Sequence, residues 1–189
     1  TTVGYRNTAL GYHAMCHSVA SFANTAVGWG AHQNALCTAS YNVSMGYYAL
    51  QNTFNGSCNV AVGAYALCGN IHASGNTAVG YCSLAKTNTA CKNTAVGYLA
   101  GCSTCGTAGI ENVYIGYEAG TRNTCGSCNI AIGSCSQNNL TGTYKGTIAI
   151  GERSCATAHY MAVFGGVNTN CVKLKGAVDF RLSLLACLP

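Results

Sequence analysis

The chain has 189 residues, enough for one ordinary domain, but only 7% of them are charged, against about 25% in a typical soluble domain. The net charge of +5 is spread thinly and forms no basic cluster, which argues against nucleic-acid binding. No run approaches the roughly 20 apolar residues that a membrane-spanning helix needs, so we expect no membrane insertion.

The cysteine content indicates an oxidising location. The 14 cysteines are slightly too few for the usual density of a disulfide scaffold. We expect an extracellular or virion-surface protein with disulfides or a mixture of disulfides and thiols; reduced cysteine acting as a small buried hydrophobe is the alternative. Because the chain begins at Thr1 without Met or a signal peptide, we also expect a processed product or a fragment.

At its N-terminus the chain carries a half-copy, Thr2-Val3-Gly4-Tyr5, of a phrase that then recurs throughout. We predict that residues 1–6 form an N-terminal cap or partial repeat. The complete phrase is typified by Asn93-Thr94-Ala95-Val96-Gly97-Tyr98, and its successive glycines are 17 to 19 residues apart. Such a regular period indicates a repeat architecture.

Two residue types mark each copy of the phrase. The recurring asparagines are Asn7, Asn24, Asn42, Asn59, Asn76, Asn93, Asn112 and Asn129, with Thr147 replacing Asn in the ninth copy. The recurring glycines are Gly11, Gly28, Gly46, Gly63, Gly80, Gly97, Gly116, Gly133 and Gly151. Asn tolerates turns and can form a stacked amide ladder, so we favour a structural role for this row over a row of ligand-binding amides.

Each phrase predicts a short strand. Thr or Val and then Val or Ile alternate with Ala and then Gly, so large and small side chains point to opposite faces. We predict that Val and Ile fill the coil, and that the Thr and Val row is interior and not an ice-binding surface. The Ala and Gly face would admit a close backbone, from the opposite wall of the coil or from an identical chain.

The variable half of each repeat is expected to form a turn, a weaker strand and a second turn. The fold prediction is therefore an all-β parallel β-solenoid, or β-roll, of about nine 17-residue coils over residues 7–166. Stacking at the spacing of neighbouring strands makes this a rod of about 45 Å. The last, approximate copy is Tyr160-Met161-Ala162-Val163-Phe164-Gly165.

Residues 167–189 differ from the repeats. From Val172 to Leu184, apolar and polar residues alternate, which predicts an amphipathic strand. We expect a C-terminal β cap or an assembly element, because an apolar face of this length needs a partner.

The phrase, and especially Asn112-Val113-Tyr114-Ile115-Gly116-Tyr117, resembles the head repeats of trimeric autotransporter adhesins and the related repeats of phage and large-virus tail fibres. The resemblance covers roughly residues 7–154. It implies a left-handed β-roll, assembly as a homotrimer, and service in attachment or as a fibre shaft. The adhesin repeat is usually nearer 14 residues, and most of those proteins lack such a cysteine content.

Two Cys-x-x-Cys pairs are the sharpest chemical candidates: Cys102 with Cys105, and Cys125 with Cys128. Their spacing comes near that of a zinc ribbon. The pairs lie in the variable halves of neighbouring coils, however, where Cys105 and Cys125 would stack. We therefore favour a Cys105–Cys125 disulfide, or free thiols, over a metal site.

Catalysis has little support. The chain has four acidic residues, and Glu118 and Glu152 fall at equivalent turn positions two coils apart, without any feature that indicates a substrate cleft. The five histidines show no metal-ligand spacing. We predict a non-enzymatic protein without catalytic residues, cofactor or metal.

The tyrosine or tryptophan after each glycine predicts an aromatic column. An exposed column would bind sugars, whereas a half-buried one would pack a corner of each coil; we favour packing. The predicted function is a fibre or adhesin segment that forms a rigid rod for attachment, with itself as partner and a cell-surface glycan or protein as receptor. The alternative is a structural protein that assembles end to end into an extracellular filament.

Overall fold

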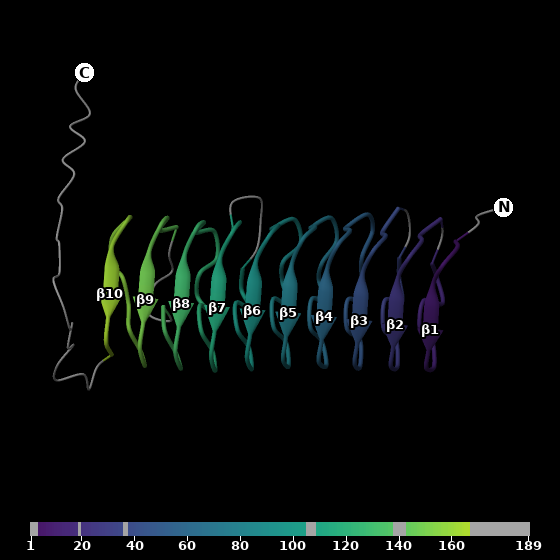
Figure 1. The fold of residues 1–189 in the computed structure, drawn as a ribbon, viewed down its shortest axis with the longest axis horizontal. Helices are drawn as coiled ribbons and strands as arrows, with labels where there is room; N and C mark the ends of the chain where they lie inside the picture. Colours follow the sequence, from purple (N-terminus) through teal and green to yellow (C-terminus); the bar gives the residue numbers. More distant parts are fainter. Residues whose placement is uncertain (1–3, 19, 36–37, 105–108, 138–142, 167–189) are drawn as a thin grey trace, which may run out of the picture.

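The protein is an all-β solenoid in a computed structural model that describes residues 4–18, 20–35, 38–104, 109–137 and 143–166. Its ten strands have three residues each and pair in parallel, in chain order, as one sheet. The strands are β1 (Thr8–Leu10), β2 (Thr25–Val27), β3 (Val43–Met45), β4 (Val60–Val62), β5 (Thr77–Val79), β6 (Thr94–Val96), β7 (Val113–Ile115), β8 (Ile130–Ile132), β9 (Ile148–Ile150) and β10 (Ala162–Phe164). The coils stack side by side along a rod (Figure 1).

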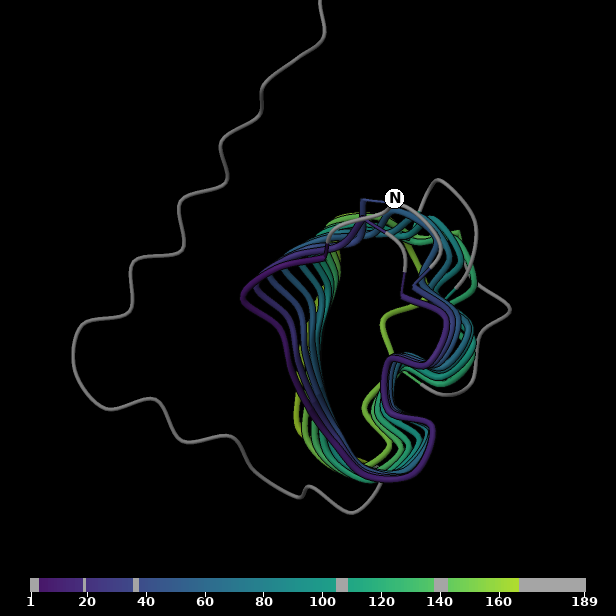
Figure 2. The same cartoon turned by 90° about the vertical axis from the view of Figure 1, so that its right-hand side faces the viewer.

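The register follows the sequence phrase without a slip. Thr77 pairs with Thr94, Ala78 with Ala95 and Val79 with Val96, and the same positions pair in every neighbouring couple of strands. Viewed along the rod, the described coils superpose around one interior (Figure 2). The predicted parallel solenoid is therefore confirmed, and the approximate last copy forms β10.

The predicted weaker strand in the variable half-coil is wrong. Among the described residues, the strands lie only in the phrase itself, and the remainder of each coil is turns and bends. The reason is the backbone, since most coils place non-glycine residues at φ near +55°, as at Tyr65, Leu67 and Cys58. Left-handed residues reverse the chain and cannot continue an extended strand.

The asparagine row forms a buried ladder. In most coils the backbone N–H of the Asn donates to Oδ1 of the Asn in the preceding coil, as Asn93 does to Asn76 at 2.8 Å. Its Nδ2 donates to a carbonyl of the following coil's turn, as Asn93 does to Gly109 O at 2.7 Å. Each amide thus satisfies main-chain groups of successive coils, so the amides of this row link the coils.

We expect Asn93→Leu to lower the free energy of unfolding by about 2–4 kcal/mol, because it leaves Asn112 N and Gly109 O buried without their partners. Chemical denaturation followed by circular dichroism measures the change. Asn88→Leu, at an exposed site, is the control and should change stability by less than about 0.5 kcal/mol. Equal losses in both variants would contradict the ladder.

The glycine row allows successive coils to stack backbone on backbone. These glycines have φ between +124° and +138°. A Cβ at Gly97 would lie far inside van der Waals contact with the backbone oxygen of Gly116, and each of the other eight glycines meets the next coil in the same way. The close neighbour is therefore the next coil of the same chain.

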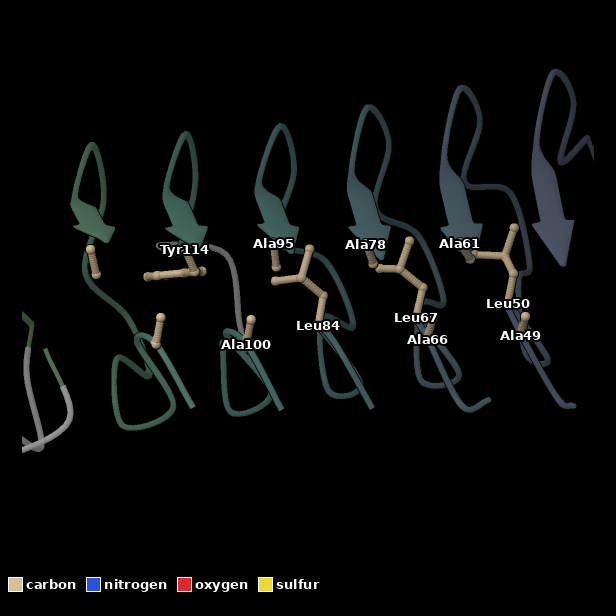
Figure 3. Close-up of a cluster of buried hydrophobic side chains, with 12 residues drawn as sticks. Ala49, Leu50, Ala61, Ala66, Leu67, Ala78, Leu84, Ala95, Ala100 and Tyr114 are labelled. Atoms are coloured by element: carbon tan, nitrogen blue, oxygen red, sulfur yellow. The ribbon is translucent and has the colours of Figure 1, made fainter. Parts of the chain in front are cut away.

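The core shows that the predicted orientation of the strand side chains is wrong. The middle residue of β2–β9 is buried and the flanking two point outward, so Ala faces the interior and Val and Ile do not fill it. Opposite these alanines, Leu50, Leu67 and Leu84 enter from the turns (Figure 3). The coil interior is narrow, so the strand contributes a methyl group where the turn contributes the larger side chain.

In the coil of β7, the strand contributes the large buried side chain and the neighbouring turns contribute glycine. Tyr114 in β7 replaces the strand alanine, while Gly101 and Gly120 replace the turn leucine on either side of it. The phenol ring is fully buried, and its Oη accepts a hydrogen bond from Asn123 Nδ2 at 2.6 Å. Burial raises the pKa of Tyr114 well above its ordinary value, so it remains a neutral phenol.

The predicted terminal elements are described only in part. At the N-terminal end, Tyr5 forms a parallel bridge with Phe22. The C-terminal strand predicted from Val172 to Leu184 lies outside the described residues.

Candidate functional site

The outward side of the sheet presents an uncharged, largely apolar surface. We call it the apolar sheet face and define it by the first and third residues of the ten strands. The first residues are Thr8, Thr25, Val43, Val60, Thr77, Thr94, Val113, Ile130, Ile148 and Ala162, and the third are Leu10, Val27, Met45, Val62, Val79, Val96, Ile115, Ile132, Ile150 and Phe164. None of these residues is charged.

The central part of this face remains open to solvent. Val79, Val96 and Ile115 keep 36%, 39% and 40% of their surface exposed. Ten strands at about 4.8 Å span roughly 43 Å. An exposed apolar row of that length is the kind of surface that marks an interaction site on soluble proteins.

Sequence reasoning assigned this face to the interior. The predicted interior position of the Thr and Val row is wrong, because Thr77, Thr94 and Val113 are half-buried on the outer side of the sheet. The only sequence signal for the orientation of the strand was the size difference between Ala and Val. It gives the alternation of faces but not which face the coil closes around.

The aromatic column lies on the surface and stacks on itself. The rings of Tyr81 and Tyr98 are 5.2 Å apart with planes at 12°, and those of Tyr98 and Tyr117 are 5.3 Å apart at 6°. Tyr65 continues the column where Ala64 lacks a ring, at 5.3 Å from Tyr47. Tyr81, Tyr98 and Tyr117 keep about half of their surface exposed, yet the faces of neighbouring rings cover one another. This geometry favours packing, because stacking on a sugar needs an open ring face.

The cysteines of the predicted zinc ribbon are not assembled into a metal site among the described residues, which contain no group of three or more His, Cys, Asp or Glu able to hold an ion. Cys105 lies outside the described residues, and with it the predicted Cys105–Cys125 disulfide and the full set Cys102, Cys105, Cys125 and Cys128. Among the described residues, free thiols include Cys16, Cys58, Cys68, Cys82, Cys91, Cys102, Cys128, Cys135 and Cys155.

One thiol has a structural role that the sequence did not indicate. A second ladder runs beside the asparagines, in which the N–H of Ser40 donates to Ser57 Oγ and that of Ser57 donates to Ser74 Oγ. The N–H of Ser74 then donates to Cys91 Sγ at 3.3 Å. Cys91 therefore takes the place of a serine hydroxyl.

Glu118 and Glu152, the two carboxylates that the sequence pairs, do not occupy equivalent positions in their coils. Glu118 is the second residue after its glycine and Glu152 is the first after its own, so their predicted equivalence is wrong. Glu118 lies near Cys135 Sγ, at 3.9 Å. Glu111 forms an exposed ion pair with Lys92 at 3.0 Å, which contributes little to stability.

His32 is a buried ionisable group at the coil position that Leu50 and Leu67 occupy in the next two coils. Both ring nitrogens are buried and have no hydrogen-bond partner. Burial lowers the pKa of His32 from 6.5 to about 4, so the folded protein holds this ring neutral.

We expect this histidine to destabilise the fold in acid. Between the folded and unfolded pKa values of His32, the unfolded chain binds the proton more readily than the folded chain does. The free energy of unfolding is therefore unaffected by His32 above about pH 6.5 and falls as the pH drops towards 4. The loss is about 3 kcal/mol by pH 4. Urea unfolding at several pH values measures it. His32→Leu should flatten this part of the profile, and an unchanged slope would contradict the assignment.

These features define the chain as a single-sheet β-solenoid with two distinctive surfaces, the apolar sheet face and the aromatic column. No family model, curated protein or solved structure matches the chain. The part of the chain that the structure describes contains no helix long and apolar enough to cross a membrane.

Proposed function

We propose that this chain is a non-enzymatic rod segment of an extracellular or virion-surface fibre, that it assembles as a homotrimer, and that it serves in attachment. The observation that carries the proposal is the uncharged apolar sheet face, which extends over all ten strands. Exposed apolar surface of this extent is stabilised by a protein partner. Since every coil presents an uncharged side chain at the same two outward positions, another copy of the chain can match it along its whole length.

The fold supports a shaft in a second way. Both ladders and the stacked glycines tie each coil only to its neighbours, which makes the molecule a rod with regular repeats. The resemblance to adhesin heads and tail fibres, and the abundance of cysteine, support the extracellular location and the trimer.

A continuous end-to-end filament is less well supported. The asparagine ladder ends at Thr147, whose N–H and Oγ1 both bond to Asn129 Oδ1. The equivalent residue of the following coil is Met161, whose side chain has no amide group to extend the ladder. Electron microscopy separates the two functions, because the fibre segment should appear as short discrete rods and the filament as long uniform threads.

Mass measurement in solution tests the assembly. The wild-type chain should have three times its monomer mass of 19.4 kDa by light scattering, under reducing conditions as well as oxidising ones. The double variant Val79→Lys, Val96→Lys places charges at the centre of the apolar sheet face, and at least tenfold weaker association is expected, because a buried unpaired charge costs several kcal/mol.

Asn88→Lys adds a charge at an exposed site away from the sheet and is the matched control. It should leave the trimer intact. The proposal is contradicted if the wild-type chain is monomeric at micromolar concentration, or if the double variant assembles as well as the control does.

A further inference from the structure

A pocket lies on the variable side of the rod, away from the apolar sheet face. Its volume is about 330 Å³, and it is lined by Asn34, Asn52, Phe54 and Ile71. These residues come from three successive coils. Ligand pockets for small molecules begin at about 300 Å³, so the space accommodates one or two sugar rings.

The pocket lining is mainly apolar, and its polar groups belong to the paired amides of Asn34 and Asn52. Asn34 Nδ2 donates to Asn52 Oδ1 at 2.8 Å, and Asn52 Nδ2 donates to Cys68 O at 3.1 Å. These bonds fix which end of each amide is oxygen. Within the described residues, Asn34 Oδ1 accepts no hydrogen bond, and it remains available to a hydroxyl group.

The apolar side of the pocket is an aromatic ring and a branched aliphatic chain, both on the surface. Phe54 is 40% exposed and Ile71 37% exposed. The rings of His72 and Phe54 have centroids 5.6 Å apart and planes at 75°, and His72 Nδ1 is 2.7 Å from Asn55 Oδ1. Unlike the tyrosines of the aromatic column, Phe54 has no ring stacked on its face among the described residues.

Charge narrows the chemistry of the ligand. No Asp, Glu, Lys or Arg occurs between Arg6 and Lys86, the part of the chain that contains the whole pocket, and the histidine beside the pocket is His72. A cationic ligand would find no carboxylate there, and an anionic one would find no Lys or Arg. A neutral ligand that has both hydroxyl groups and an apolar face matches the amides and the ring together.

We propose that this pocket binds a neutral pyranose unit of a glycan. Phe54 stacks on the apolar face of the sugar, while Asn34 and Asn52 hydrogen-bond its hydroxyl groups. Ile71 closes the side of the pocket next to Phe54. The inference rests on the proposed role in attachment and supplies that role with a ligand class and a site.

Saturation-transfer NMR on the intact chain tests the site. The probes are the methyl pyranosides of glucose, galactose, mannose and N-acetylglucosamine, and sialyllactose serves as a charged comparison. At least one neutral probe should bind, with millimolar affinity typical of a single sugar ring. Phe54→Ala should weaken binding about tenfold and Asn34→Leu at least fivefold.

Tyr41→Ala removes a more exposed aromatic residue outside the pocket and should leave binding unchanged. Because Phe54 and Asn34 lie at the surface, circular dichroism should show both variants folded. The proposal is overturned if no neutral probe binds, if sialyllactose alone binds, or if both pocket variants bind as the wild type does.

Light scattering on the same samples distinguishes failure of this site from failure of the proposed fibre. A trimer that binds no neutral sugar overturns the pocket and leaves the rod assembly standing. A change in mass with Phe54→Ala, without a change in sugar binding, would assign the pocket to contacts between chains and would overturn it as a sugar site.

Discussion

Gly97→Ala should prevent stable folding of the solenoid. The alanine Cβ would collide with the backbone oxygen of Gly116, and φ at this position is +138°, a conformation that L-residues rarely adopt. Neither strand can move, because each is paired on both sides. We expect a loss of more than about 4 kcal/mol, a large part of the 5–15 kcal/mol that stabilises a typical domain.

Gly75→Ala is the matched control for this substitution. Gly75 has φ of +71°, but its nearest neighbour would be Lys92 Cγ at 3.6 Å, an ordinary contact. Lys92 and Cys58 occupy the equivalent position in other coils with φ of +59°. A loss of about 1 kcal/mol is therefore expected. Chemical denaturation measures the free energy of unfolding of both variants. Similar losses in the two would show that strain at φ, and not stacking of the coils, accounts for the glycine row.

Tyr114→Ala should cost about 3–5 kcal/mol, because it leaves a cavity between Gly101 and Gly120 that no other large side chain fills. The neighbouring coils indicate how to repair it. Leu50, Leu67 and Leu84 occupy the position of Gly101 with φ between +46° and +53°, close to its own +60°. Adding Gly101→Leu to Tyr114→Ala should therefore restore the pairing of strand alanine with turn leucine and recover at least about 2 kcal/mol.

A double-mutant cycle measured by urea unfolding tests this pairing. Gly101→Leu alone should destabilise the protein, since the leucine would enter the ring of Tyr114. Tyr117→Ala, at a ring that is 51% exposed, is the control and should cost about 1 kcal/mol or less. Additive effects of the two core substitutions would show that strand and turn do not share one space.

The register of the fold could be predicted because its cause is local and periodic. Asn93 and Gly97 recur at fixed positions, and a parallel stack pairs each copy with the next, so the phrase itself determines which residues pair. The weaker strand was predicted wrongly because nothing in the sequence signals that residues such as Tyr65 and Leu67 adopt left-handed conformations. Those conformations come from the closure of the coil.

The residues of the candidate sites were even harder to predict, because the stacking of the coils brings them together. Asn34, Asn52, Phe54 and Ile71 lie up to 37 positions apart, and only the pitch of the stack brings them around one pocket. Cys91 gave no sign of its ladder, because its role depends on Ser74 in the coil before it.

The sequence by itself determined that this protein is a parallel β-solenoid, where its coils begin, and which asparagines and glycines hold them in register, because those properties repeat with the chain. Only the tertiary structure decided which side of each strand faces inward. The coil is narrow, and where its turns supply Leu50, Leu67 and Leu84 the strand opposite contributes only an alanine. The larger Val and Ile side chains are therefore directed outward, where they form the apolar sheet face.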